Sequence, residues 1–386
     1  MSSLGLDVGG TFLKAAWLDE GPLQVTRRPI PDFLDTTGDA REIDPDQLMD
    51  AISGLLDEVI GQRECSRIFV TGQMAGLAFV DGDGRAVAPL ISWQDTRFGD
   101  VRHVRAALAP DELARLGDGL RIGLPLVTLS DLEVPEGAYV TSLVGFVVGA
   151  LIGSRARWMH ATDAAAMGML DVVACQWSPS ALVIGGLGSS QLPEPVADVV
   201  FAGRSQRYGA QVATAVGDQQ AALLGAGLEA ECISMNIATG CQVSRLSSEP
   251  SSPAQLRPYF AGQYLQTITH LPAGRLLRQA VAQDIGHEPE ESDWEHAIRG
   301  AGDRNTAVGL AVVDIADACV QAARRLGGES ASAILFSGGL AQRVPALRQA
   351  IEEQLSLPAS VFPGDDAALE GLRQLALDQR TNPDRT

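Results

Sequence analysis

The chain has 386 residues, which is enough for two domains, and 46% of them are hydrophobic, which is ample for buried cores. The formal net charge of −19 at pH 7 argues against nucleic acid or an anionic membrane as a partner, because both would be repelled. An anionic substrate would therefore need local compensation from backbone N–H groups, a cation or a metal.

Five cysteines are scattered along the chain without CxxC spacing, and none has a histidine at zinc-like spacing. This pattern predicts reduced thiols in a cytoplasmic protein. The sequence reaches an apolar strand at once, without a basic leader, so no signal peptide is expected.

The first 30 residues contain the stretch LGLDVGGTFLKAAWLDE, in which two apolar runs flank a polar turn with two glycines. Three short strands are predicted there, at Leu4–Val8, Phe12–Leu18 and Leu23–Ile30. The spacing of apolar residues then predicts a helix over Pro45–Ile60, with Asp44 as its N-cap. The next predicted elements are a strand at Arg67–Thr71 ended by Gly72, extended chain at Arg85–Trp93, and a helix at Phe98–Leu116 interrupted near Pro110.

The most apolar run is YVTSLVGFVVGALIG, from Tyr139 to Gly153, in which three glycines are spaced by four residues. That spacing resembles the interface of a membrane helix. The run is shorter than the roughly 20 residues that span a bilayer. We therefore expect one buried core helix over 139–153 that packs closely through its glycines.

The second half contains a stretch similar to the opening one, CISMNIATGCQVSRL at Cys232–Leu246. Both stretches read as strand, small polar turn and strand, which makes them a degenerate internal repeat. Such a repeat predicts two related halves that face each other. When the two stretches are aligned with each other, Asp7 corresponds to Asn236, Gly9 to Ala238, Gly10 to Thr239 and Thr11 to Gly240.

Around this repeat, the composition of 178–207 predicts loop with short helices, because Ser, Pro and Gly dominate it. The closing part of the chain alternates strand and helix patterns. The predicted elements are a strand at Gln211–Val216, a Gly217-Asp218 turn, a helix at Gln219–Gly227, a strand at Ala333–Phe336, a turn at Ser337–Gly339, a helix from Val344, a strand at Ala359–Phe362 and a helix from Asp366.

The two turns have the composition of a phosphate site. Glycines such as Gly9 and Gly10 allow positive φ, so that successive N–H groups can point into one concavity and bind an anion. Thr11 adds a hydroxyl, and Lys14, the only lysine of the sequence, adds a mobile charge. Asp7 would hold Mg²⁺ rather than phosphate, since like charges repel.

Thr239 and Gly240 would complete the clamp on the second hairpin, an arrangement that suits phosphoryl transfer. The alternative is that DVGGT is only a tight hairpin with a solvated acid. The sequence has no GxxxxGK[ST] motif, and GGLGSSQ at Gly185 lacks the features of a dinucleotide fingerprint.

DVGGTFLK resembles the first phosphate motif of the actin, sugar kinase and Hsp70 superfamily. TGQMAG (71–76), ISWQDTR (91–97), VGDQQAALLGAG (216–227), MNIATGCQVS (235–244), RPYFAGQYL (257–265) and SGGLAQ (337–342) occur in the order of the FGGY carbohydrate kinases, and are similar to the sedoheptulokinase-like branch. The resemblance implies an α/β fold with two ribonuclease H-like (actin-like ATPase) domains flanking a cleft, the second one shortened. It implies a sugar-binding domain at 1–210 and a nucleotide-binding domain at 211–386.

The resemblance also implies roles for individual residues. Asp218 matches the general base that accepts a proton from the sugar hydroxyl; from the residues alone, it could instead be a helix N-cap. Gly338 and Gly339 match the adenosine turn. Gln73, Met74, Trp93, Asp95 and Arg97 match the sugar site.

Two of the sugar-site residues have structural alternatives: core packing for Trp93 and an ion pair with Asp95 for Arg97. The implied activity is the ATP- and Mg²⁺-dependent phosphorylation of a ketose or related polyol. A homodimer is one possible oligomeric state of such a protein. A glucokinase-like aldose kinase would often carry a Cys/His zinc cluster, and none is present. A third possibility is a sensor of sugar or nucleotide descended from a kinase.

Two departures from the pattern bear on the substrate. Relatives commonly have a histidine where this sequence has Ala75. The second domain lacks a segment between Gln266 and Ala331, so adenine contacts cannot be assigned there. The five histidines match no catalytic spacing and are expected to be surface or core residues.

Overall fold

The computed structural model describes residues 2–19, 21–35, 38–364 and 366–381. It divides into two compact units: unit 1 comprises residues 1–225, 257–262 and 366–386, and unit 2 comprises residues 226–256 and 263–365. This partition differs from the boundary expected at residue 210. Residues 211–225 belong to unit 1 because β14 (Gln211–Ala213) and β15 (Val216–Gly217) pair with a strand of its sheet.

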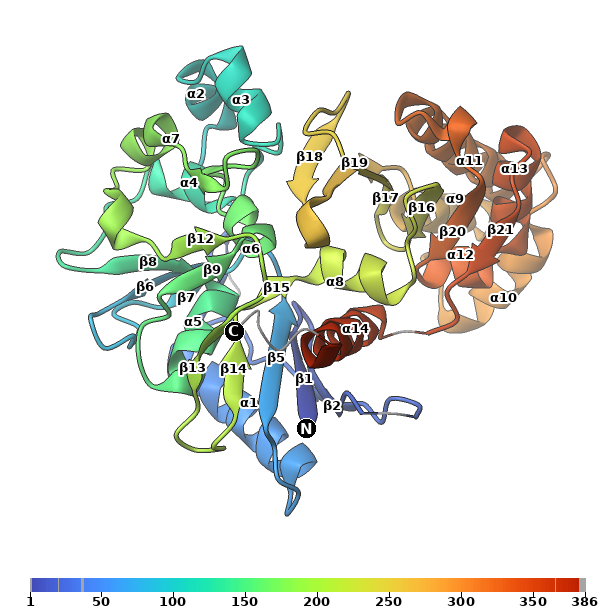
Figure 1. The fold of residues 1–386 in the computed structure, drawn as a ribbon. Coiled ribbons are helices and arrows are strands. Elements are labelled where there is room, and N and C mark those ends of the chain that lie inside the picture. Colours follow the sequence, from blue (N-terminus) through green and yellow to red (C-terminus); the bar gives the residue numbers. More distant parts are fainter. Residues whose placement is uncertain (1, 20, 36–37, 365, 382–386) are drawn as a thin grey trace. The chain divides into compact units, whose positions relative to one another are not determined.

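Unit 1 is built on a seven-stranded sheet (Figure 1). Its opening strands confirm the predicted three-stranded start, although the third is shorter than expected. The hairpin strands β1 and β2 are antiparallel, whereas β1 and β5 are parallel. The order is β13 (Phe201–Arg204), β14, β5 (Arg67–Gly72), β1 (Ser3–Val8), β2 (Phe12–Trp17) and β3 (Thr26–Pro29), with β15 also paired to β5.

Helix α1 (Pro45–Ile60) confirms the sequence prediction at both ends. The Asp44 carboxylate accepts hydrogen bonds from the N–H groups of Asp46 and Gln47, at 2.9 and 3.0 Å. These bonds satisfy two of the donors that a helix start leaves free. The apolar side of α1 is fully buried in the core of unit 1.

We expected one helix over 139–153, but the structure has a strand followed by a helix there. Tyr139–Ser142 forms β8, which pairs with β6 (Leu77–Val80), and the helix α5 covers Leu143–Ile152. The Ser142 hydroxyl caps the helix by accepting from the N–H of Gly145 at 2.9 Å, which fixes the change from strand to helix there. Among the described residues, no helix is both long and apolar enough to cross a membrane.

The region 178–207 was predicted as loop with short helices; the short helix α7 (Pro179–Ile184) confirms part of this, but the region also contains two strands. Proline and glycine obscure their pattern. Strand β12 (Glu194–Val196) forms by pairing with β9 (Trp158–His160), an earlier strand of the chain, and β13 forms a hairpin with β14, the next strand. The interruption predicted near Pro110 is confirmed. The remaining elements of unit 1 include β4 (Glu42–Ile43), β7 (Leu90–Ile91), α2 (Val101–Ala106), α3 (Pro110–Arg115), α4 (Pro125–Leu129), α6 (Ala161–Ala166), β10 (Leu170–Asp171) and β11 (Gln176–Trp177).

Unit 2 repeats the strand arrangement of unit 1. Its hairpin β16–β17 is antiparallel and β16 is parallel to β20, as in β1–β2 and β1–β5. The internal repeat read from the sequence is therefore a repeat of topology. The sheet order is β18 (Gln255–Pro258), β19 (Tyr264–Leu271), β17 (Cys241–Ser247), β16 (Cys232–Ile237), β20 (Ala333–Ser337) and β21 (Ala359–Val361).

Among the described residues of unit 2, five α-helices bury an apolar cluster against the sheet. The turn predicted at Ser337–Gly339 is shorter than expected, because a helix begins at Gly339 itself. The helices are α9 (Gly274–Ile285), α10 (Glu291–Gly300), α11 (Ala307–Arg325), α12 (Gly339–Arg343) and α13 (Pro345–Leu355).

Two helices of unit 1 meet at a pair of glycines. Helix α8 (Asp218–Gly225) packs against α14 (Ala367–Thr381), and Figure 1 shows the two side by side. A Cβ atom added at Gly371 would lie 1.9 Å from the carbonyl oxygen of Ala221, and one added at Gly225 would lie 1.9 Å from that of Ala367. This close approach fixes the position of α8, and hence of Asp218 at its first residue.

We predict that Gly371→Ala lowers the free energy of unfolding by about 1–3 kcal/mol, because the added methyl group must push backbone away. The matched control is Gly300→Ala at the end of α10, where nothing lies within 4 Å of the added atom. That change should alter the free energy by less than about 1 kcal/mol. Urea unfolding of the three proteins measures both, and equal effects of the two substitutions would contradict the packing described.

Candidate active site

Three parallel strands end side by side in unit 1. In the register of the sheet, Val8 on β1 pairs with Gly72 on β5, and Gly72 pairs with Gly217 on β15. Because the carboxyl ends of parallel strands collect at one edge, the residues that follow them are brought together. Asp7 is the second-last residue of β1, Gln73 follows β5 and Asp218 follows β15, so the three side chains belong to the same edge of the sheet.

The turn after β1 is tight, but not for the reason expected from its glycines. Neither Gly9 nor Gly10 has a positive φ. Gly9 is instead required by a close approach, since its added Cβ would lie 2.8 Å from the carbonyl oxygen of Phe12, which accepts its N–H at 3.1 Å. The turn is therefore tight because the backbone of Gly9 lies close to the backbone of Phe12, and not because Gly9 or Gly10 is left-handed.

Gly10 lies beside side chains expected to contact a sugar. A Cβ atom added there would lie 3.7 Å from Trp93 Nε1, 3.7 Å from Gln94 Nε2 and 3.9 Å from Gln73 Oε1. Trp93 is 43% exposed, so its ring is not core packing, which was the alternative. The structure thus brings the expected phosphate turn and part of the expected sugar site within a few ångströms of each other.

Asp7 is a buried carboxyl in an acidic environment. Burial raises its pKa to about 7; Lys14 opposes this rise, and the charges of Asp218 and Asp366 add to it. The Lys14 Nζ atom lies 3.9 Å from Asp7 but 3.0 Å from Asp366. The single lysine is therefore paired mainly with Asp366, a partner that the sequence analysis did not identify.

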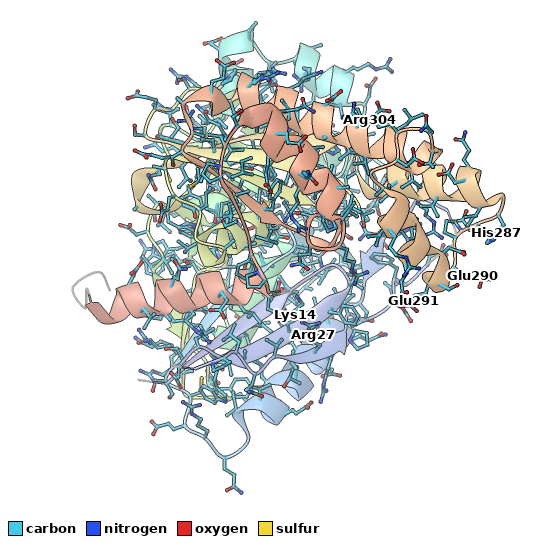
Figure 2. All side chains as sticks on the ribbon, turned by 90° about the vertical axis from the view of Figure 1, so that its right-hand side faces the viewer. Lys14, Arg27, His287, Glu290, Glu291 and Arg304 are labelled. Carbon is cyan, nitrogen blue, oxygen red and sulfur yellow. The ribbon has the colours of Figure 1, made fainter. Side chains whose placement is uncertain are left out.

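Arg27 completes this cluster from the neighbouring strand. It is paired with Lys14 across β2 and β3, and Figure 2 shows the two side chains next to each other. Its Nη2 atom donates to both carboxylate oxygens of Asp366, at 2.8 and 3.0 Å. Asp366 is thus held between two cations just before α14 begins.

Asp218 is the first residue of α8, and its carboxylate accepts from the N–H of Gln219 at 2.7 Å. An N-cap would instead bind the N–H groups two or three residues further on, so this contact is not the N-cap arrangement. Burial raises the pKa of Asp218 to about 6, opposed by the Gln219 hydrogen bond and by the charges of Arg257 and Arg121. Neither arginine was singled out from the sequence, since both are far from Asp218 along the chain.

The carboxylate of Asp95 is already occupied by groups of its own loop and of the remote Arg41. It accepts hydrogen bonds from the backbone N–H groups of Arg41 and Arg97, at 2.9 and 3.0 Å, and forms an ion pair with the Arg97 side chain at 2.8 Å. Burial of Asp95 opposes ionisation, but these bonds hold its pKa below the usual value. Arg97 also pairs with Glu42, so of its two alternatives the structure contains the ion pair.

The segment after β5 carries the other expected sugar residues. The Gln73 amide is buried and its Nε2 atom lies 3.5 Å from the Gly9 carbonyl oxygen. Met74 packs on Gly217, where an added Cβ would lie 2.7 Å from its sulfur. Ala75 is buried with a φ of 65°, a conformation that few non-glycine residues adopt.

A buried polar chain anchors the strand end next to Asp218. The Gly217 N–H donates to the Thr162 hydroxyl at 2.9 Å, and that hydroxyl lies 2.8 Å from His160 Nδ1. The Thr162 N–H also donates to Nδ1, so this nitrogen is an acceptor and the ring carries its proton on Nε2. Burial lowers the pKa of His160 to about 4, which keeps the ring neutral.

Asp163 follows on the same helix and is also buried. Its Oδ2 atom accepts from the Ser142 hydroxyl at 2.6 Å, and its Oδ1 atom has no hydrogen-bond partner among the described residues. Burial raises its pKa to about 7; the Ser142 bond opposes the rise, and the charge of Asp218 adds to it.

The corresponding turn residues of unit 2 lie at the ends of its own parallel strands. Thr239 and Gly240 connect β16 to β17, where the Ala238 N–H donates to the Gly240 carbonyl at 2.8 Å. Gly338 has a φ of 89°, and an added Cβ there would lie 2.5 Å from the carbonyl oxygen of Ile237. Only glycine fits this position, and α12 begins at Gly339, the next residue.

No group of three or more His, Cys, Asp or Glu side chains among the described residues is arranged to hold a metal ion. Mg²⁺ does not need such a cage, because it usually takes one or two carboxylates together with substrate phosphates. Asp7 fits this role, since its nearest ion-pair contact is the lysine at 3.9 Å.

Residues 2–225 match the N-terminal domain of the FGGY family of carbohydrate kinases. Sedoheptulokinase from Homo sapiens is 26% identical over 345 residues, which are 75% of this chain and 72% of that protein. Among solved structures, xylulose kinase from Rhodospirillum rubrum has a TM-score of 0.86 at 19% identity, covering 97% of this chain and 90% of that one. Gluconate kinase from Lactobacillus acidophilus has a TM-score of 0.85 at 16% identity, covering 100% and 91%. The expected two-domain, actin-like α/β fold is confirmed.

We predict that Thr162→Val lowers the free energy of unfolding by about 1–3 kcal/mol, because it leaves the Gly217 N–H buried without an acceptor. Thr162→Ser keeps the hydroxyl and should cost less than half as much. Urea unfolding measures both variants. Equal losses of stability would show that the hydroxyl contributes no more than the methyl group, which would contradict the role given to the Gly217 hydrogen bond.

The raised pKa of Asp163 predicts a pH-dependent stability. Its pKa is about 7 in the fold against 3.8 for a free side chain, so the folded state binds more protons between these values. This contribution to stability is present below about pH 4 and is lost as the pH rises through about 7. We expect Asp163→Asn to lose less stability than the wild type between pH 5 and pH 8 in urea unfolding. An unchanged pH dependence would contradict the burial of an ionisable group at 163.

Proposed function

Because the chain belongs to the FGGY family of carbohydrate kinases, we propose that it transfers the γ-phosphoryl group of ATP to a hydroxyl of a ketose or related polyol. Asp218 is the general base of this reaction. The observation that carries the proposal is its position, at the strand edge shared with Asp7 and the DVGGT turn, with a pKa of about 6. A base with that pKa is deprotonated at neutral pH and still able to take up a proton.

The proposed step transfers one proton and one phosphoryl group. The acceptor hydroxyl gives its proton to the Asp218 carboxylate while its oxygen forms a bond to the γ-phosphorus. The bond from that phosphorus to the bridging oxygen breaks, and ADP leaves. Asp218 then releases the proton to solvent. Positioning and charge neutralisation supply most of the catalysis in such a reaction.

We assign phosphate binding to Gly9, Gly10, Thr11 and Lys14. Lys14 is paired with Asp366 at 3.0 Å, so a phosphate would compete with that carboxylate for it. Asp7 is the proposed Mg²⁺ residue; the metal would neutralise phosphate charge there. In unit 2, the assigned nucleotide residues are Thr239, Gly240, Gly338 and Gly339.

We assign the acceptor to the surface near Gln73, Met74 and Trp93. The exposed Trp93 ring offers a flat apolar face for the C–H surface of a sugar. Asp95 and Arg97 act here by holding the Trp93 loop in place, since their charges are paired with each other. On this proposal residues 1–210 bind the sugar and residues 211–386 bind most of the nucleotide.

We predict that Asp218→Asn lowers kcat by about 10²–10⁴-fold, the usual contribution of a general base. Wild-type kcat/KM should fall as the pH drops below about 6, because the protonated carboxyl cannot accept the proton. ADP release with MgATP and a panel of ketoses, aldoses and polyols provides the assay. The control is Asp111→Asn, an exposed residue of α3.

Full turnover by Asp218→Asn would exclude Asp218 as the base. A wild type that binds MgATP and a sugar without any turnover would favour a second candidate function, that of a sensor derived from a kinase. The pairing of Lys14 with Asp366 is the observation in favour of that candidate.

A further inference from the structure

A row of charged side chains crosses one face of the sheet of unit 1. Asp7 on β1 pairs with Lys14 on β2, and Lys14 pairs with Arg27 on β3. Directly paired residues of antiparallel strands project to the same face, so these three side chains follow one another across it. Gly5 lies on that face too, and a Cβ atom added there would lie 3.1 Å from Leu369 of α14. Helix α14 therefore covers the face that carries the row.

Asp366, the residue before α14, joins the two cations of this row. Its carboxylate lies 3.0 Å from the Lys14 Nζ atom and accepts hydrogen bonds from Arg27 Nη2 at both of its oxygens, at 2.8 and 3.0 Å (Figure 2). Its backbone belongs to the start of the helix, since its carbonyl oxygen accepts from the Glu370 N–H at 3.1 Å. One carboxylate thus receives donors from two cations, which is how proteins hold an oxyanion.

The next residue of β3 provides a comparison for Arg27. Successive residues of a strand point to opposite faces, and Arg28 accordingly turns to the side of α1, where it pairs with Glu58 at 2.7 Å. The two arginine side chains are similarly exposed, at 44% for Arg27 and 40% for Arg28. Only Arg27 belongs to the row that contains Asp7, the proposed Mg²⁺ residue.

The row lies close to the turn that was assigned to phosphate. Lys14 is three residues beyond Thr11, on the strand that leaves that turn, and Asp7 is two residues before Gly9. A phosphate monoester carries about two negative charges and three acceptor oxygens, so it suits two adjacent cations better than a carboxylate with one charge. Phosphate and carboxylate repel each other, so a phosphate can take this position only when Asp366 gives it up.

We propose that Lys14 and Arg27 together bind a phosphate group of the nucleotide, and that Asp366 occupies this anion position without nucleotide and competes for it. The inference rests on the proposed kinase function and deepens it, because it adds Arg27 to the phosphate site and gives Asp366 a role. Asp366 holds the two like charges in one place, but it also lowers the affinity for nucleotide, because part of the protein is not free to bind.

Arg27→Gln tests the binding role of the arginine. Calorimetry measures Kd for a non-hydrolysable ATP analogue with Mg²⁺, and the ADP-release assay measures KM for MgATP. We expect Arg27→Gln to raise both by about tenfold, because a charge-assisted contact is lost, and to leave KM for the acceptor unchanged. Arg27→Lys keeps the charge without the forked geometry and should lie between wild type and Arg27→Gln.

Arg28→Gln is the matched control for Arg27→Gln, and it should change neither Kd nor KM. Equal effects of the two substitutions overturn the inference. Inorganic phosphate alone is titrated as a comparison. If its binding depends on Arg27 while binding of the analogue does not, the site belongs to free phosphate, and the inference is overturned as well.

Asp366→Asn tests the competition. The amide attracts the two cations less than the carboxylate does, so we expect Kd for the analogue to fall by about threefold or more. Asp366→Ala repeats the test without any acceptor, and Glu58→Gln, which removes the partner of Arg28, should leave Kd unchanged. Urea unfolding establishes that each variant is folded. Weaker binding by folded Asp366→Asn and Asp366→Ala would make Asp366 a residue that only positions the cations, and would overturn the inference.

The same measurements separate this inference from the proposed kinase function. The expected shifts in Kd without turnover of any acceptor would support the inference and contradict the kinase function. Turnover by the wild type, with Kd unchanged by Arg27→Gln and Asp366→Asn, would overturn the inference and leave the kinase function intact. A wild type and an Asp366→Asn variant that both fail to bind the analogue would overturn both.

Discussion

The parallel register of β1, β5 and β15 is the constraint on which the candidate site depends. Val8, Gly72 and Gly217 lie in line across the sheet, so the chain leaves all three strands at the same edge. Gly72 makes this possible, because an added Cβ would lie 2.5 Å from the Val8 carbonyl oxygen and 2.8 Å from a Val144 methyl group. A side chain at that position would push β1, which carries Asp7, away from β5, the strand that also pairs with β15 before Asp218.

Burial at this edge sets the chemistry of its carboxyl groups. Asp7, Asp163 and Asp218 all have raised pKa values, between about 6 and about 7, and burial is the largest cause for each. The acidic chain offsets their repulsion with few cations: Lys14 comes from the same hairpin as Asp7, whereas Arg121 and Arg257 come from segments far from Asp218 in sequence. Lys14 offsets the charge of Asp7 and Asp366, whereas Arg121 and Arg257 offset the charge of Asp218. A reaction that brings further negative charge to this edge depends on those few groups.

Much of this arrangement follows from local sequence. The DVGGT hairpin, the capped helix after Asp44, the repeated hairpin at 232–246 and the place of Asp218 between strand and helix are all readable, because neighbouring residues determine them. The prediction of positive φ at Gly9 and Gly10 was wrong; at Gly9 a close approach to the Phe12 carbonyl, rather than left-handed geometry, requires the glycine.

Contacts between distant segments could not be read from the sequence. Asp366 reaches Lys14 from more than 300 residues away, and Arg121 and Arg257 reach Asp218 from opposite directions along the chain. The hydrogen bonds that occupy the Asp95 carboxylate also include one from a remote residue, the backbone N–H of Arg41. Strand β12 was missed for the same reason, because its partner β9 lies more than 30 residues earlier in the chain.

The central claim is that Asp218 and the DVGGT turn act on one reacting phosphoryl group. A crystal structure with MgADP, aluminium fluoride and an acceptor tests it most directly, since the fluoride takes the place of that group. The account predicts the fluoride beside the backbone of Gly10 and Thr11, with an acceptor oxygen within about 3 Å of the Asp218 carboxylate. A fluoride bound away from that turn, or an acceptor whose hydroxyls do not reach Asp218, would contradict it.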